Sequence, residues 1–405
     1  MIKFALRRNL IYPLQLLIFS LARDIEKDIL GRVYKFDYPF HFTILMFIGE
    51  ILAGLIIYLY QKKIISKKKS PVRTRLDSVV SERKLKTVDG TCKIMFLIFC
   101  AGLMDFVQTV ISLYTPKFSN ISSSIGSRLG GFLTIVDALY YYFVLRFSIL
   151  RHQFFSLCGI GICLIIIIIT EFIFQEFNIF LRFYELIIYY LIIFIQQFCS
   201  AMVDSTEKYL FEYNNNNPFY ILLLEGIFGF ILSLIYGICD SPLYYIGLYT
   251  NYNSPELLSI VIILLVLYII LSGLKNAFRV QTTKIFSPMT TTFIDYLLNP
   301  IYLIIYFALN EDFLINGKRK YAHFFINLFL ALIITLLGFI YNEFIIIFCC
   351  GLEKDTYQEV SNRASLNEEK ENAKELFALY DLEEDQEEKI YDFDNNYDFR
   401  IFENF

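Results

Sequence analysis

Long apolar runs separated by short polar segments dominate this chain. Nine of these runs reach or approach the roughly 20 residues that a helix needs to cross a bilayer. A shorter apolar run at 10–22 contains Pro13 and predicts a short or truncated first helix; the alternative is a signal peptide, although no small-residue cleavage site follows it. The nine long runs cover residues 40–60, 92–114, 119–145, 153–174, 186–209, 218–239, 257–279, 287–309 and 322–348. The pattern predicts an all-α polytopic membrane protein of about ten transmembrane helices.

Basic residues between the runs predict which loops face the cytoplasm. The loop 61–91 contains ten Lys and Arg residues, whereas the loop 240–256 contains none. By the positive-inside rule, the first of these loops is cytoplasmic and the second is not. The loop 310–321 disagrees, with three basic residues. Two further loops on the predicted cytoplasmic side are flanked by Arg146, Arg151, Arg279 and Lys284. This distribution places both termini in the cytoplasm, which requires an even number of spans.

Composition supports the membrane class and separates the C-terminal tail from the rest. The chain is 56% hydrophobic, with a mean hydropathy of +0.52. Residues 353–405 contain 17 Asp and Glu against 6 Lys and Arg, and they lack long apolar runs. We therefore expect three parts: an N-terminal segment at 1–39 with the first helix, a transmembrane domain at 40–348, and a largely disordered acidic cytoplasmic tail at 353–405.

Polar residues inside the apolar runs are the candidate functional residues. A charged side chain at the centre of a bilayer costs at least about 2.5–3.5 kcal/mol, so such residues face the interior of the bundle or water. Glu225 shares one helical face with Gly229 and Ser233. One shared polar cavity would accommodate several such faces; the alternative is that single ion pairs only lock helices together. The other polar faces contain Glu50, Asp105, Arg128, Asp204 and the series Thr291, Asp295 and Asn299.

Other function classes lack their sequence signatures. The three histidines His41, His152 and His323 lie near the ends of apolar runs, and no two are spaced as metal ligands. The chain contains no CxxC pair, no GxSxG motif and no phosphate-binding GxxxxGK[ST] loop. The basic loop 61–91 has no interleaved aromatic residues, which favours lipid contact over nucleic-acid binding. We expect no catalytic activity, no metal, no cofactor and no nucleic-acid partner.

One segment is characteristic of a known family. The stretch "EKYLFEYNNNNPFYILLLEGIFGF" at 207–230 has an acidic-basic pair that ends one span, a proline that opens the next, and a Glu-Gly-x-x-Gly step. It resembles the F subgroup of solute carrier family 35, nucleotide-sugar-transporter-like members of the EamA-like drug/metabolite transporter superfamily. Weaker likenesses are "FIGE" at 47–50, "SSSIGSR" at 122–128 and "SPMTTTFIDYLLNP" at 287–300. The resemblance covers about residues 39–348.

The resemblance implies ten helices in an inverted five-plus-five repeat around a central solute site. A similar spacing from Ser119 to Arg128 and from Ser287 to Asp295 agrees with such a repeat. The implied activity is secondary transport of a small organic solute, such as a nucleotide sugar or a related metabolite, by alternating access. Arg128 would attract an anionic group and pair with Asp295 in the empty site. The remaining expected substrate-binding residues are Glu50, Asp105, Glu225 and Asn299, of which the first three would bind polar groups or a coupling proton.

A second function class stays open at this point. A membrane scaffold or receptor without transport activity would act through the acidic tail, bound to a cytosolic partner. Tyr357-Gln-Glu-Val360 fits a tyrosine sorting signal, and we expect an endomembrane of the Golgi or lysosome type rather than the plasma membrane. Membrane lipid and a small-molecule substrate are the expected partners, and a homodimer is left open.

The loop charges lead to a test of topology. A tag inserted near Ser70 and one at Phe405 should both be reached by a cytoplasmic probe, and a tag near Asn251 should not, because the positive-inside rule keeps basic loops in the cytoplasm. Selective permeabilisation with antibody staining measures this. Opposite sides for the Ser70 and Phe405 tags would rule out an even number of spans.

Overall fold

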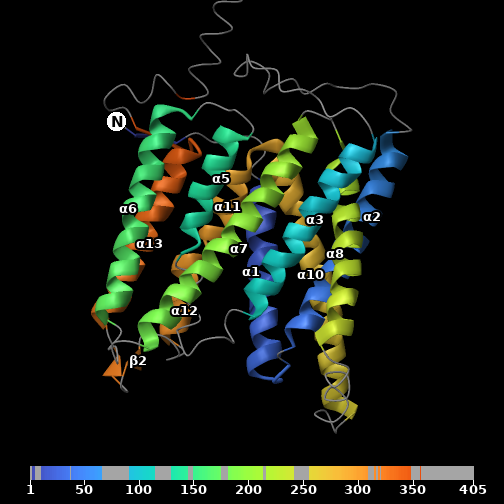
Figure 1. The fold of residues 1–405 in the computed structure, drawn as a ribbon, viewed down its shortest axis with the longest axis horizontal. Helices are drawn as coiled ribbons and strands as arrows, with labels where there is room; N and C mark the ends of the chain where they lie inside the picture. The colour runs from blue at the N-terminus through green and yellow to red at the C-terminus, as the bar shows by residue number, and fades with distance from the viewer. Residues whose placement is uncertain are drawn as a thin grey trace, which may run out of the picture.

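A bundle of long helices forms the described part of the chain (Figure 1). In the computed structural model, the described residues are 2–4, 11–36, 38–65, 91–114, 129–144, 149–174, 181–212, 216–240, 255–308, 314–315, 318–319, 321–347 and 356. Seven of the described helices are long and apolar enough to cross a membrane. The chain is therefore a polytopic helical membrane protein. Most of the acidic tail, the basic segment 66–90 and Arg128 lie outside the described residues.

Eleven helices and two short strand pairs are described. The first five helices are α1 (Ile11–Arg32), α2 (Pro39–Ile65), α3 (Thr91–Tyr114), α5 (Gly131–Phe143) and α6 (Arg151–Phe174). The others are α7 (Leu181–Glu212), α8 (Pro218–Asp240), α10 (Pro255–Ile285), α11 (Pro288–Tyr296), α12 (Asn299–Ala308) and α13 (Tyr321–Tyr341). Strand β1 (Ile2–Phe4) pairs antiparallel with β4 (Ile345–Ile347), and β2 (Leu314–Ile315) pairs with β3 (Lys318–Arg319).

Proline and asparagine explain where several helices begin. Helices α2, α8, α10 and α11 each start at a proline, whose fixed φ and missing N–H suit the first helical position. At the start of α8, the Asn217 Oδ1 accepts a hydrogen bond of 2.9 Å from the backbone N–H of Phe219. The Asn217 Nδ2 also donates to the Gln61 Oε1 at 2.9 Å. The asparagine-rich turn is thereby tied to the end of α2.

Several helices differ from their predicted extent. Helix α1 has 22 residues and continues past the apolar run that ends at residue 22. The predicted span 287–309 is divided into α11 and α12 by a turn at Leu297 and Leu298. The division precedes Pro300, which cannot donate a hydrogen bond to the preceding turn. Asp295 and Asn299 therefore belong to different helices, and the predicted regular series from Thr291 to Asn299 is interrupted.

Glycines bring α2 against two neighbouring helices. On the α8 side, Gly226 lies against the Glu50 Cβ, and Gly229 lies against the ring of Phe47. On the α10 side, Gly49 and Gly273 meet backbone to backbone, so that a side chain on either would overlap the facing carbonyl. Small residues permit this close approach between membrane helices. The contact fixes Glu50 at the crossing of α2, α8 and α10.

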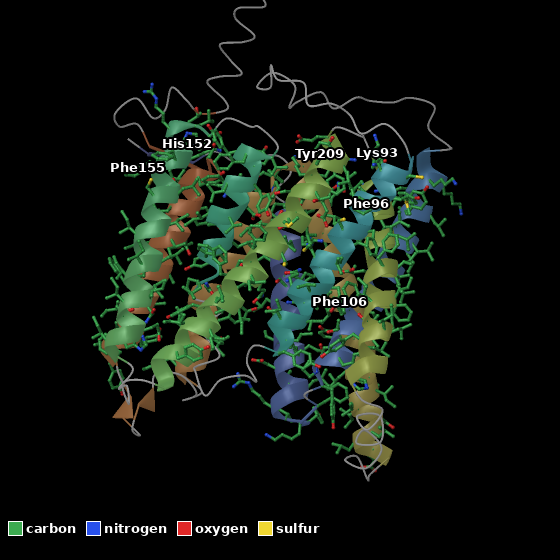
Figure 2. The ribbon with its side chains drawn as sticks, in the orientation of Figure 1. Lys93, Phe96, Phe106, His152, Phe155 and Tyr209 are labelled. Atoms are coloured by element: carbon green, nitrogen blue, oxygen red, sulfur yellow. The ribbon has the colours of Figure 1, made fainter. Side chains whose placement is uncertain are left out.

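Helices α6 and α13 pack side by side and are joined at both ends (Figure 1). At one end the His152 Nε2 lies 3.4 Å from the Glu343 Oε1, and at the other the His323 Nε2 lies 3.0 Å from the Glu171 Oε1. The crossed pairing shows that the two helices run antiparallel. Figure 2 places His152 at the same end of the bundle as Lys93 of α3 and Tyr209 of α7.

The backbone contact between α2 and α10 gives a stability prediction. Gly273→Ala should lower the free energy of unfolding in detergent by about 1–3 kcal/mol, because the new methyl group overlaps the Gly49 carbonyl. Gly161→Ala is the matched control, since its Cβ would meet only the Ile135 Cδ1, at 3.8 Å. Thermal unfolding of the two purified variants compares them. Equal melting temperatures would show that α2 and α10 do not meet through their backbones.

Candidate functional site

A buried arginine joins α7 to α10. The Arg279 Nη1 lies 2.5 Å from the Asp204 Oδ1, and the Nη2 lies 2.6 Å from the Glu207 Oε1. The side chains are 13%, 6% and 0% exposed, in the order Arg279, Asp204 and Glu207. Asp204 and Glu207 are three residues apart on α7 and therefore face the same direction. A guanidinium suits this position because its several N–H donors can serve two carboxylates at once.

Glu225 enters the same region from α8. Its residue is 1% exposed, and both of its carboxylate oxygens are buried without a hydrogen-bond donor. Its charged neighbours are Glu207, Asp105 and Arg279, and the Glu207 carboxyl is within hydrogen-bonding reach. Gly102 of α3 allows the approach, since a Cβ there would lie 3.3 Å from the Glu225 backbone oxygen.

Glu50 and Asp105 bring two more carboxylates to the cluster. The Asn276 Nδ2 of α10 donates a hydrogen bond to the Glu50 Oε1, and the Gln108 Nε2 donates to the Asp105 Oδ1 at 2.6 Å. Asp105 interacts electrostatically with Glu50 and with Arg279. Five helices, α2, α3, α7, α8 and α10, thus contribute to one buried group. We call it the acidic core, and it consists of Glu50, Asp105, Asp204, Glu207, Glu225 and Arg279.

The charges in the acidic core do not balance. Among the residues that the structure describes, five carboxyl groups surround one guanidinium. The nearby cation Lys208 is engaged elsewhere, 2.8 Å from the Glu212 Oε1 and within 3.0 Å of the Phe286 backbone oxygen. Lys275 adds electrostatic attraction at Asp105. Burial makes an unpaired carboxylate expensive, so the excess favours protons or a cationic group at this position.

A second polar cluster lies where α5 and α11 meet. The Thr292 Oγ1 donates a hydrogen bond to the Asp137 Oδ2, and both residues are buried. Nearby, the Thr290 Oγ1 donates to the Asn342 Oδ1 at 2.7 Å, and the Thr283 and Thr291 hydroxyls are 3.0 Å apart. Asp137 also interacts electrostatically with Asp204 and Arg279, which connects the two clusters.

A cavity of about 520 Å³ opens between α1, α2, α8 and α10. Its lining is mostly apolar and aromatic, with two glutamine side chains. The α10 lining residues Ala277 and Phe278 directly follow Asn276, which binds Glu50. The cavity therefore lies beside the helix that supplies the basic member of the acidic core. It is lined by Tyr12, Ile57, Tyr60, Gln61, Phe219, Ala277, Phe278 and Gln281.

The predicted site residues fall into three groups. Glu50, Asp105 and Glu225 are brought together in the acidic core. Asn299 is buried at the start of α12, close to the Tyr296 hydroxyl. Asp295 lies on α11, but its side chain is outside the described residues, as is the whole of Arg128. The pairing of Arg128 with Asp295 stays a prediction.

Sequence reasoning missed the central cation. Arg279 was placed at a loop because the apolar run ends at 279, whereas α10 continues to Ile285 and buries the arginine. The overlooked signal is the face formed by Asn276, Arg279 and Thr283, which are spaced by three and four residues. Asp137 was also missed. The overlooked signal is Thr134, three residues earlier, which together with Asp137 forms a polar face on α5.

Comparisons with known proteins do not assign the chain to a family. No protein-family model matches it, and no curated protein matches it. A solved structure described only as "Crystal structure of protein" aligns with 82% of this chain and 96% of its own, at 9% identity and a TM-score of 0.48. Likeness at this level does not establish a shared fold.

The arginine bridge leads to a stability prediction. Arg279→Met should lower the free energy of unfolding by about 3–5 kcal/mol, because it leaves Asp204 and Glu207 buried without their cation. Adding Asp204→Asn and Glu207→Gln should recover most of that loss. Detergent unfolding curves measure both. In the control, Lys62→Met should cost about 0–1 kcal/mol, because Lys62 is an exposed residue in the last turn of α2.

A triple variant no more stable than Arg279→Met would contradict the account, since the loss would then come from packing rather than from uncompensated charge.

Proposed function

We propose that this protein is a secondary transporter that moves a small organic solute across a membrane by alternating access. The observation that carries the proposal is the acidic core, a group of five buried carboxyl side chains and one arginine at the meeting of five helices. All five helices are candidate membrane spans; four contribute carboxyl groups, and the fifth, α10, supplies Arg279. The coarser class, a polytopic helical membrane protein, rests on those apolar helices.

The size of the acidic core argues for a solute site rather than a structural lock. A purely structural ion pair between α7 and α10 needs one carboxylate for Arg279. Helix α7 already supplies two, Asp204 and Glu207. Glu50, Asp105 and Glu225 add further buried acids without adding a cation. Each costs at least about 2.5–3.5 kcal/mol in a bilayer unless something compensates it. A transported group or a coupling ion supplies that compensation during the transport cycle.

The packing of the helices supports an inverted repeat. If α1, α2, α3, α5 and α6 exchange with α7, α8, α10, α11–α12 and α13, each main contact maps onto another main contact or onto itself. The α1–α10 contact corresponds to α7–α3, and the α2–α10 contact corresponds to α8–α3. The α2–α8, α5–α11 and α6–α13 contacts correspond to themselves. Inverted repeats place the solute site at their interface, where the acidic core lies.

Matching sequences on the exchanged helices support the same proposal. "GLMDFVQ" at 102–108 on α3 corresponds to "GLKNAFR" at 273–279 on α10. Asp105 then aligns with Asn276, and Gln108 aligns with Arg279. "TIVDAL" at 134–139 corresponds to "TFIDYL" at 292–297. "TEFI" at 170–173 corresponds to "NEFI" at 342–345.

Hydrogen bonds repeat along with the sequence on α6 and α13. The Ser156 Oγ donates to the His152 backbone oxygen, and the Asn327 Nδ2 donates to the His323 backbone oxygen, each at 2.9 Å. In each helix the bond therefore joins the backbone oxygen of the histidine to the side chain four residues later. The match of 134–139 with 292–297 makes Asp137, rather than Arg128, the counterpart of Asp295.

The resemblance to the F subgroup of solute carrier family 35 extends the proposal to nucleotide sugars and related metabolites. The acidic core favours a solute with a cationic or neutral polar group next to the carboxylates, and an anionic group would need Arg279 or Arg128. A membrane of the Golgi or lysosome type is proposed on the same resemblance. The substrate panel must therefore include cationic, neutral and anionic solutes.

Uptake by purified protein in proteoliposomes tests the proposal. Wild type should accumulate at least one solute of the panel above empty liposomes. Glu50→Gln should lower that uptake by about tenfold or more, because a charge-assisted hydrogen bond is worth about 1.5–3 kcal/mol. The variant keeps an oxygen that can accept from Asn276, so it should fold. Glu256→Gln, on an exposed residue at the start of α10, should behave as wild type.

Equal uptake by wild type, Glu50→Gln and empty liposomes across the whole panel would contradict transport. That result would favour the scaffold or receptor alternative, in which deleting residues 353–405 removes function.

A further inference from the structure

Glu207 and Glu225 have a relationship that the arginine bridge does not explain. Glu207 uses its Oε1 to bind Arg279 at 2.6 Å, while its Oε2 is buried without a donor. Glu225, from a different helix, has both oxygens buried without a donor and is 1% exposed. The two carboxyl groups are within hydrogen-bonding reach of each other. One oxygen of Glu207 on α7 and the whole carboxyl of Glu225 on α8 therefore lie close together in the interior without a donor.

A hydrogen bond between the two carboxyl groups requires a proton on one of them. An ionised carboxylate is an acceptor at both oxygens, so two carboxylates repel each other and form no hydrogen bond. If one of them is protonated, its O–H donates to the other, and the pair carries one negative charge rather than two. Arg279, which already binds the Glu207 Oε1, then compensates the remaining charge.

Neighbouring acidic side chains further favour a proton on the Glu207–Glu225 pair. Three further acids interact electrostatically with the pair from α2, α3 and α7, namely Glu50, Asp105 and Asp204. Arg279 from α10 is the cation of the group. The pair therefore lies in a negative environment, where a second negative charge on it is disfavoured.

A metal ion is a weaker candidate for this position. Within the part of the chain that the structure describes, no group of three or more His, Cys, Asp or Glu side chains is arranged to hold one. A proton needs only the two oxygens that face each other.

We propose that Glu207 and Glu225 share one exchangeable proton, bound between the Glu207 Oε2 and the Glu225 carboxyl, and that this proton is the coupling ion of the transporter. The coupling role rests on the proposed function, whereas the proton site itself does not. With the proton bound, α7 and α8 are joined through the pair. When the proton leaves to water, Glu225 becomes an uncompensated charge that favours an arrangement open to water or occupied by a polar group of the solute.

Infrared spectroscopy of the full-length purified protein detects the proton directly. A protonated carboxyl has a carbonyl band that disappears on ionisation. Wild type should show such a band that titrates with pH, and Glu225→Gln should lose that component while Glu256→Gln keeps it. An unchanged titrating band in a folded Glu225→Gln protein would overturn the proposal. A titration that moves with the Na⁺ concentration would also overturn it, because the site would then bind a metal cation.

A second measurement needs no variant and covers the case in which Glu225→Gln does not fold. A hydrophobic carbodiimide reacts with protonated carboxyl groups inside membranes, and peptide mapping by mass spectrometry locates the adduct. Labelling of wild type should fall on Glu225 or Glu207 and should decrease as the pH rises. Labelling confined to other residues, or independent of pH, would overturn the proton site.

Transport data separate the two proposals. If the band and the adduct appear but no solute of the panel is taken up, the proton site stands and the transport function fails. If uptake occurs and neither the band nor the adduct is found, the transporter stands and the proton site fails. Solute-driven acidification of the liposome lumen, lost in Glu225→Gln, tests the coupling itself; uptake without proton movement would contradict it.

Discussion

The bridge from Arg279 to Asp204 and Glu207 is the interaction on which the rest of the structure depends. It holds α7 against α10 with charged groups that neither helix could bury alone. The acids of α2, α3 and α8 are attracted electrostatically to Arg279 and lie in the interior of the bundle rather than facing lipid. The glycines at 49, 102, 226 and 273 make that arrangement sterically feasible, because they let the helix backbones approach one another. The ion pairs of Arg279 and the close glycine contacts together determine where the acidic core forms.

The acidic core is also poorly suited to being only a structural element. A stable lock in a membrane would balance its charges, since an unpaired buried ion costs several kcal/mol. Here Glu225 is left without a donor, although it lies within the field of Arg279. The proposed inverted repeat would give this imbalance a place in a mechanism. In that repeat, Asn276 on α10 would correspond to Asp105 on α3 and Arg279 to Gln108, so the two halves would be alike in form and unlike in charge. Such a centre can have different partners in different conformations.

Much of the architecture could be predicted from hydrophobic runs alone, because a bilayer demands apolar helices of a certain length. Charged residues were harder to place. The apolar run of α10 ends at Arg279, and from sequence the arginine therefore resembles a loop residue, although the helix continues to Ile285. Its partners on α7 lie 72 and 75 residues earlier in the chain, a pairing that local pattern cannot indicate. Glu225 was found because it interrupts an otherwise apolar run. The break between α11 and α12 was missed because Pro300 acts on the turn before it.

The central claim is that the acidic core is exposed to one side of the membrane and then to the other. Gln108, which donates to Asp105 and is only partly buried, is the position to probe. In protein whose native cysteines are replaced, Gln108→Cys should react with a membrane-impermeant thiol reagent in right-side-out vesicles and also in inside-out vesicles. The site proton should shift the balance between the two as the pH is changed. Labelling from one side only, at every pH and with every solute of the panel, would contradict alternating access.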